Sequence, residues 1–166
     1  SRSGYSDDSD DCDGWALIRW RGAVTSAIKG ARGQQLLREM AEALDAMPDK
    51  RLVSGELEVE GEFCALGVLG SRRGIDLKAL DPEDPECVAK AFDIARALAS
   101  EIVYENDEVV DEWRSVEHEI CGPMRPHWPD FGSRIRHTSV YDESAPARRW
   151  RHVRAWVESK IIKEAP

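Results

Sequence analysis

The sequence predicts an all-α fold, a domain built like a helical bundle that leaves room for one small β-hairpin near residues 52–60. Apolar residues recur at helical spacing in six segments, and capping residues, prolines or glycines stand at the ends of several of them. A hydrophobic content of 42% supplies a packed core, and 33% charged residues supply a solvated surface. A chain of 166 residues can fold around one such core without cross-links.

The first two helices are predicted over residues 15–29 and 34–47. In the first, one face carries Leu17, Trp20, Val24, Ala27 and Ile28. In the second, one face carries Leu36, Leu37, Met40, Leu44 and Met47. Pro48 ends the second helix, because proline cannot continue it. The segment between the helices is short and contains two glycines, so an antiparallel helical hairpin is expected.

Residues 51–73 have a mixed pattern. Partial alternation of apolar and polar residues around Gly55 and Gly61 predicts the small β-hairpin. A short helix is predicted to follow and to end at Gly74, with an apolar face made of Phe63, Leu66 and Leu69.

The residues around Asp84 predict the start of a helix. The Asp84 side chain can cap, Pro85 suits the first helical position, and Glu86 favours the positive end of a helix. Helices are therefore predicted over residues 85–92 and 95–105.

An acidic helix is predicted over residues 107–120. Its apolar side carries Val109, Trp113, Val116 and Ile120. Its other side carries Glu108, Asp111, Glu112, Glu117 and Glu119. The last helix is predicted over residues 147–163, with a buried face of Trp150, Val153, Val157 and Ile161.

These elements divide the chain into four regions. Residues 1–13 hold five aspartates among serines and glycines and are expected to form an acidic flexible arm. Residues 14–121 form the helical domain. Residues 122–145 interleave prolines with aromatic residues, which predicts a long, ordered loop. Residues 146–166 form a basic C-terminal helix that packs on the domain.

Charge is distributed unevenly along the chain, which carries −9 overall. Residues 1–145 hold 17 basic and 30 acidic residues (−13), and residues 146–166 hold six and two (+4). An acidic body repels phosphate backbones and attracts basic surfaces. No apolar run is long enough to cross a membrane, and the N-terminal segment lacks the apolar stretch of a signal peptide. A cytoplasmic protein without membrane contact is expected.

No catalytic or cofactor motif is present, since the sequence has no glycine-rich phosphate loop, nucleophile elbow or Cys-x-x-Cys pair. The residues with metal-ligand chemistry that lie nearest one another are His118, Cys121, His127 and His137. Their spacing fits no common zinc pattern. The scattered cysteines are typical of reduced thiols: Cys12, Cys64, Cys87 and Cys121. We therefore predict no enzyme activity, metal, cofactor or disulfide.

Residues 88–102 resemble a helix-turn-helix in the placing of their small and apolar residues. Such a motif needs cations facing phosphates. The second helix and the residues just after it instead contain one cation, Arg96, and four carboxylates: Glu101, Glu105, Asp107 and Glu108. Two packed helices without a DNA role are the preferred interpretation. A DNA-binding regulator that uses Arg96 and the basic last helix stays open as an alternative.

Two features point to contact with another macromolecule. The acidic side of the 107–120 helix either imitates nucleic-acid phosphates or serves only for solvation. Trp156 lies about 120° from the buried face of the last helix, at about 100° per residue. It is either an interface anchor or a side chain that packs against the proline-rich loop.

Five segments together resemble small uncharacterised proteins of phages and prophages: Trp15–Ala23, the helix around Leu36–Met40, Cys64–Gly67, Asp81–Asp84 and Tyr104–Glu108. The likeness covers residues 4–108 and the last helix, Arg149–Ile161, and residues 113–145 look like an insertion relative to it. The resemblance implies a phage origin and, by context, a host-defence inhibitor of the anti-CRISPR kind. It implies no established activity and no functional residues.

The hypothesis that follows is a non-enzymatic, phage-encoded binding protein that inhibits a host defence complex. Its expected partner is a host protein or ribonucleoprotein complex with a basic groove for nucleic acid, and direct DNA binding is not expected. The residues expected to bind this partner are Asp107, Glu108, Asp111, Glu112, Glu117, Glu119, Trp128 and Trp156. A small phage structural or assembly protein is a further alternative.

Overall fold

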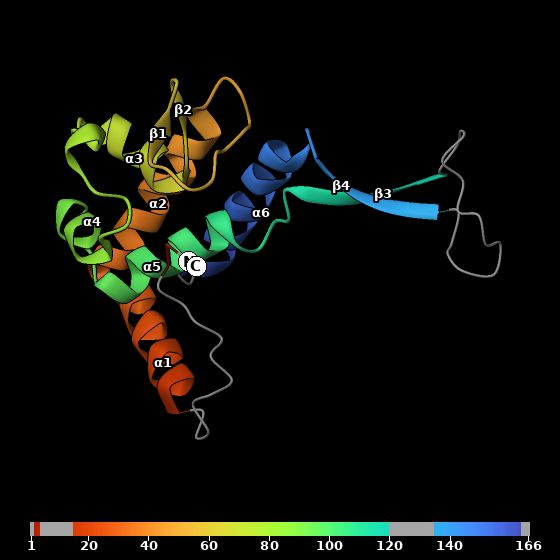
Figure 1. The fold of residues 1–166 in the computed structure, drawn as a ribbon. Helices are drawn as coiled ribbons and strands as arrows, with labels where there is room; N and C mark the ends of the chain where they lie inside the picture. The colour runs from red at the N-terminus through yellow and green to blue at the C-terminus, as the bar shows by residue number, and fades with distance from the viewer. Residues whose placement is uncertain (1, 4–14, 120–134, 164–166) are drawn as a thin grey trace.

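A computed structural model of the chain describes residues 2–3, 15–119 and 135–163, and in this part the all-α prediction is confirmed (Figure 1). Its six α-helices are α1 (Trp15–Lys29), α2 (Ala31–Ala46), α3 (Ala65–Arg73), α4 (Pro85–Ala91), α5 (Arg96–Asp107) and α6 (Ala145–Lys160). A 3-10 turn, η1, spans Leu77–Ala79. The strands of the described part form two separate antiparallel pairs, β1 (Glu58–Val59) with β2 (Glu62–Phe63) and β3 (Trp113–Glu119) with β4 (Ile135–Tyr141).

The core lies where α2 and α5 meet α3 and α6. Helix α2 packs on α3 and α6, and α5 packs on α1, α3, α4 and α6. Side chains buried at its centre include Leu36, Leu44, Leu66, Leu98, Ile102 and Val153. Burying one aliphatic side chain of this size contributes about 1.5–3 kcal/mol, so this shared interior is the main source of stability.

Helix α1 is only partly attached to the core. Its second half buries Val24 and Ile28 against the body, whereas Trp15 and Ile18 in its first half are exposed. Figure 1 shows this first half projecting from the body. The apolar face predicted for the whole helix is therefore buried only in its second half.

The helix ends follow their sequence signals. Asp84 caps α4 by accepting hydrogen bonds from the backbone N–H groups of Glu86 (2.9 Å) and Cys87 (3.0 Å). Gly74 ends α3 in the left-handed conformation, at φ 72°. None of the helices in the described ranges has the length and apolar character needed to cross a membrane.

The small β-hairpin is confirmed, a few residues later than predicted. Strands β1 and β2 pair with Val59 opposite Glu62, and Glu60 and Gly61 form the two-residue turn with positive φ angles of 51° and 85°. Such a turn matches the twist of two antiparallel strands.

The predicted acidic helix over residues 107–120 is wrong, because α5 ends at Asp107 and strand β3 follows. The carbonyl oxygen of Asn106 accepts a hydrogen bond from Nε of Arg149 at 2.7 Å. The Asn106 carbonyl is thus paired with a side chain of α6. In a continuing helix it would instead accept from the backbone N–H of the residue four positions later.

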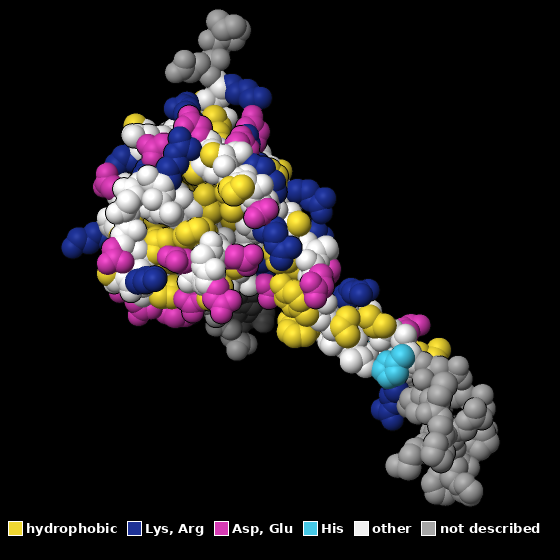
Figure 2. Space-filling model, turned by 90° about the horizontal axis from the view of Figure 1, so that it is seen from above, with side chains coloured by type: hydrophobic (Ala, Val, Ile, Leu, Met, Phe, Trp, Pro, Cys, Tyr) yellow, Lys and Arg dark blue, Asp and Glu magenta, His cyan; other side chains and the backbone are white. Residues whose placement is uncertain are grey.

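Strands β3 and β4 form a ribbon that extends away from the helical body in both views (Figures 1 and 2). Seven residue pairs join them, from Trp113 opposite Tyr141 to Glu119 opposite Ile135. The loop predicted over residues 122–145 is therefore wrong for residues 135–141, which form β4. Residues 122–134 of that prediction lie outside the described part.

Two glycines allow close backbone contacts. A Cβ atom on Gly67 in α3 would lie 1.9 Å from the carbonyl oxygen of Leu57. A Cβ atom on Gly33 in α2 would lie 2.0 Å from the carbonyl oxygen of Ala27. The second contact brings the first turn of α2 against the end of α1, where the two helices meet at a bend. The predicted antiparallel hairpin is wrong, because α2 continues away from α1 (Figure 1) and α1 packs on α5 as well.

We expect Gly67→Ala to lower the free energy of unfolding by about 1–3 kcal/mol, because the new methyl group forces α3 away from Leu57. Gly22→Ala is the matched control, since Gly22 also lies in a helix but a Cβ there meets nothing within 4 Å. It should raise stability by about 0.5–1 kcal/mol. Urea unfolding measures both, and equal effects of the two changes would contradict the close contact at Gly67.

Candidate functional site

The ribbon is attached to the body through Arg149 of α6. This side chain is 1% exposed. Its Nε donates to the Asn106 carbonyl and its Nη1 donates to the Leu52 carbonyl, both at 2.7 Å. Its Nη2 donates to the Glu112 carboxylate at the start of the ribbon. A buried guanidinium is tolerated only when its donors are used in this way.

Glu112 is half-buried and already has partners within the fold. Its carboxylate pairs with Arg149 and also accepts a hydrogen bond from the Ser54 hydroxyl. The prediction of Glu112 as a partner-binding residue stays a prediction, but its charge is already balanced within the fold.

Asp107, the last residue of α5, is also largely buried. Arg2 lies beside it, with Nε of Arg2 3.0 Å from Oδ2 of Asp107. The Asn106 side-chain amide donates to Oδ1 of Asp107 at 2.7 Å. Burial raises the pKa of Asp107, although Arg2 and the Asn106 hydrogen bond act in the opposite direction.

An exposed aromatic pair lies where the ribbon leaves the body. The rings of Trp113 and Tyr141 meet edge to face, with centroids 6.0 Å apart and planes at 83°. Trp113 is 56% exposed and Tyr141 is 43% exposed. Figure 2 shows hydrophobic side chains gathered at this junction.

Carboxylates flank the aromatic pair along the chain. Glu108 and Asp111 precede Trp113, and Glu143 follows Tyr141; all three are exposed. We call the exposed group at the foot of the ribbon the root surface: Glu108, Val109, Asp111, Trp113, Tyr141 and Glu143. It combines large apolar side chains with negative charge, which suits a contact with a partner that has a basic surface.

The other predicted acidic residues are spread along the ribbon. Glu117 of β3 is exposed, and one of its carboxylate oxygens lies 3.8 Å from Nδ1 of His137 on β4. Glu119 is the last residue of β3, opposite Ile135. Glu108 and Asp111 are exposed in the short segment between α5 and β3, whereas Glu117 and Glu119 lie on β3 itself. Trp128 lies outside the described residues.

Trp156 is not an exposed anchor, so this part of the prediction is wrong. The side chain is 8% exposed and belongs to the hydrophobic core. Helix α6 packs on both α2 and α5, and it therefore buries a wider face than one apolar stripe. Trp113 and Tyr141 were not among the predicted site residues. The available signal was the β-branched and aromatic residues of 113–119 and 135–141 on either side of a segment rich in glycine and proline.

The residues with metal-ligand chemistry named from the sequence do not come together in the described part. His118 lies opposite Arg136 and His137 lies opposite Glu117, so adjacent pairs of the ladder place the two imidazoles on opposite faces of the ribbon. Cys121 and His127 lie outside the described residues. Cys64 and Cys87 are free thiols.

The helix-turn-helix segment forms α4 and α5, which pack on each other. Arg96, the cation that a DNA contact would use, pairs with Glu86 of α4 at 3.2 Å. The pair is exposed, so it is worth little in energy, but it places a carboxylate beside the only cation of α5.

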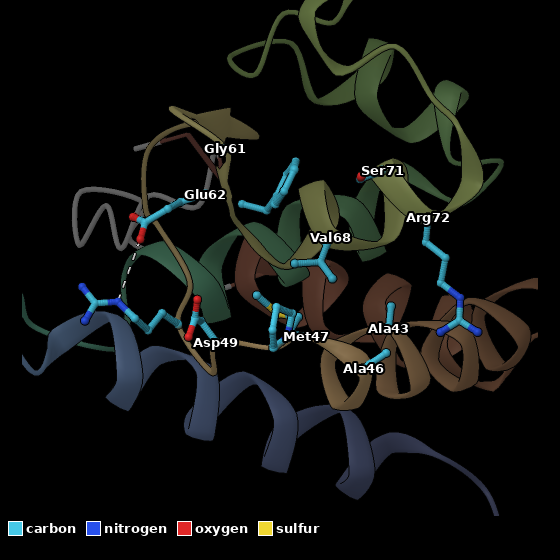
Figure 3. Close-up of a pocket in the computed structure, with 12 residues that line it drawn as sticks. Ala43, Ala46, Met47, Asp49, Gly61, Glu62, Val68, Ser71 and Arg72 are labelled. Carbon is cyan, nitrogen blue, oxygen red and sulfur yellow. Dashed lines mark ion pairs between the residues drawn. The ribbon is translucent and has the colours of Figure 1, made fainter.

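A hollow of about 380 Å³ opens between the end of α2, α3 and the β1–β2 hairpin (Figure 3). Met47, Phe63 and Val68 give it apolar walls. Arg51 and Arg72 at its edge have carboxylate neighbours, Glu62 at 3.9 Å and Glu42 at 3.2 Å. It can accept an apolar side chain or small ligand, but it holds no pair of groups arranged for acid–base chemistry.

A second, more polar hollow of about 280 Å³ lies beneath α1. Its lining includes Trp20, Glu101, Glu105 and Lys160. Oε2 of Glu105 lies 2.6 Å from Nε2 of His152 on α6. Burial raises the pKa of Glu101, and the neighbouring Glu105 carboxylate adds to this effect.

Comparisons with protein-family models, with curated proteins and with solved structures found no match to this chain. Its function therefore has to follow from the geometry and charge of its own side chains.

We expect Arg149→Met to lower the free energy of unfolding by about 3–5 kcal/mol, because it leaves the Glu112 carboxylate and two buried carbonyls without their donor. Arg151→Met on the same helix is the control. Arg151 is exposed, so its loss should change stability by no more than about 0.5 kcal/mol. A loss below about 1 kcal/mol for Arg149→Met in urea unfolding would contradict its role as the central contact.

The raised pKa of Glu101 gives a pH dependence with a definite sign. The folded protein holds this proton more tightly than the unfolded chain, so stability decreases as pH rises from the ordinary value of 4.5 through the folded pKa. Glu101→Gln removes the titrating group and should make that decrease smaller. Urea unfolding from pH 4.5 to neutral pH measures it. Glu83→Gln, at an exposed carboxyl, should keep the wild-type profile, and the same profile for Glu101→Gln would disprove the assignment.

Proposed function

We propose that the chain is a non-catalytic binding protein that docks on a basic surface of a macromolecular partner through its root surface. The observation that carries this proposal is the exposed Trp113–Tyr141 pair with carboxylates on both sides of it in the chain. Tryptophan and tyrosine are preferred anchors of protein interfaces, and exposed carboxylates guide a basic partner toward them.

The shape of the ribbon supports this assignment. Within residues 15–119 and 135–163, β3 and β4 pair only with each other, and apart from the start and end of the ribbon they lie away from the helical body (Figure 1). A two-stranded ribbon in water is marginally stable at best. A partner that covers the aromatic pair would remove its apolar surface from water and strengthen the ribbon at the same time.

The resemblance to phage proteins suggests which partner to test first. In that setting the partner is a host defence complex, and the chain acts as an anti-CRISPR-like inhibitor. Its carboxylates would occupy a basic groove that normally binds nucleic-acid phosphates. Of the predicted acidic residues, Glu108 and Asp111 are the ones that the root surface contains.

We expect two changes at the root surface to weaken partner binding in different ways. Trp113→Ala removes an anchor and should raise Kd by about 30-fold, equivalent to about 2 kcal/mol. Asp111→Lys with Glu143→Lys should slow association by about tenfold and reduce its dependence on salt. The partner is captured from host lysate with a photo-crosslinker at position 141, purified and assayed by surface plasmon resonance.

The matched control is Glu60→Lys with Glu83→Lys. Both residues are exposed, and the double change alters the net charge by the same amount. Glu60 lies in the β1–β2 turn and Glu83 lies before α4, so neither belongs to the root surface. Equal effects of the two double variants would show that overall charge, and not the root surface, controls binding. Tight binding of duplex DNA by the wild type in a gel-shift assay would favour the DNA-binding regulator instead.

A further inference from the structure

Arg2 and Ser3 fill a pocket at the end of α5. The side chain of Arg2 is 4% exposed, and its Nε and Nη2 lie 3.0 and 3.5 Å from the two carboxylate oxygens of Asp107. Ser3 is buried, and its hydroxyl donates to Oε1 of Glu108 at 2.6 Å. These contacts join residues 105 positions apart in the chain.

The pocket is built by the helical body and not by Arg2. The Asn106 side chain accepts from the N–H of Ala65 at 3.0 Å and donates to the Val53 carbonyl at 2.8 Å and to Asp107. The backbone N–H of Gly55 adds a hydrogen bond to Asp107. The carboxylate is therefore held in place by groups that remain when Arg2 leaves.

The pocket needs a cation, and Arg2 is the exchangeable one. A buried carboxylate without a counter-charge is costly, and burial raises the pKa of Asp107 for this reason. Arg149 is also near, but its donors are used by Leu52, Asn106 and Glu112. Arg2 contributes its charge from a separate stretch of chain, and within the described residues its side chain meets the Asp107 carboxylate and the Cys64 thiol.

We propose that Asn106, Asp107 and Glu108 form an arginine-recognition pocket, and that Arg2–Ser3 occupies it in place of an arginine side chain of the partner. This inference rests on the proposed function, and it specifies one contact of the basic partner. Asp107 pairs with the guanidinium: Nη2 of Arg2 donates to Oδ1 at 3.5 Å, and Nε lies 3.0 Å from Oδ2 as an ion pair. Nε and Nη1 of Arg2 are buried and make no hydrogen bond within the described residues, and Glu108 accepts from the Ser3 hydroxyl. A guanidinium has several donors on one planar group and can improve this pairing in a partner's arginine, whereas a lysine ammonium acts as a single point charge.

Occupation by Arg2 has a measurable consequence. When a pocket is already filled, a competing ligand can bind only the molecules whose pocket is open. Its apparent affinity is the intrinsic affinity multiplied by that open fraction. Removing the Arg2 side chain should therefore strengthen binding of an arginine ligand, although it also removes a contact that stabilises the fold.

The test uses N-acetyl-argininamide as the probe and the NMR signals of the Asn106 side-chain amide as the readout. The full chain with Arg2→Ala should bind the probe at least about tenfold more tightly than the wild type. N-acetyl-lysinamide should bind at least about tenfold more weakly than the arginine probe. The control variant, Arg2→Ala with Asp107→Asn, should lose binding, because it removes the charge but keeps the shape.

Equal affinity of wild type and Arg2→Ala, or undiminished binding after Asp107→Asn, would overturn the pocket. If Arg2→Ala loses its folded spectrum, Arg2→Lys supports the same comparison, because an ammonium competes less well for two oxygens. The probe experiment involves no partner, so its failure leaves docking at the root surface intact. Conversely, failure of docking in the Trp113→Ala experiment leaves the affinity for the probe unchanged.

Discussion

The Arg149 guanidinium joins parts of the chain that are far apart in sequence. It leaves α6, reaches the loop at Leu52 and the end of α5 at Asn106, and pairs with Glu112 where the ribbon begins. Because the guanidinium is buried, each of these hydrogen bonds offsets part of the free-energy cost of removing its charge from water. Arg148 of the same helix holds both ends of the ribbon as well, at the Asp111 carbonyl (2.7 Å) and the Asp142 carboxylate (2.8 Å). The direction in which the ribbon leaves the body therefore depends on two neighbouring arginines of the last helix.

This contact also explains which elements could be predicted from the sequence. Helices α1, α2, α4, α5 and α6 each bury a face that is visible as local periodicity, and their ends carry local signals such as Asp84. Strand β3 has apolar residues at helical spacing, Trp113 and Val116, so its own sequence also fits a helix. The interactions that make this segment a strand come from residues far away in the sequence. Strand β4 begins 16 residues after β3 ends, and Arg149 binds the carbonyl at the end of α5.

The candidate site, like the fold, could be predicted only where the signal is local in the sequence. The sequence predicted an acidic contact surface, and three of its carboxylates are exposed: Glu108, Asp111 and Glu117. Counting charges could not show that Asp107 and Glu112 are neutralised, because their partners Arg2 and Arg149 lie far away in the chain. Local periodicity also misplaces the tryptophans. Trp156 lies off one stripe of α6 but is buried because α6 packs on two helices, whereas the ring of Trp113 meets Tyr141 and stays 56% exposed.

Two arginines thus meet the carboxylates near the foot of the ribbon, and they differ in kind. Arg149 is fixed by three separate acceptors and belongs to the framework. Arg2 pairs with one carboxylate and also meets the Cys64 thiol, in a pocket whose shape is maintained by Asn106 and its neighbours. In the proposed recognition a partner's arginine would replace Arg2 and leave the Arg149 contacts intact. On that proposal, recognition depends less on the net charge of −9 than on which carboxylates have a counter-ion that can leave.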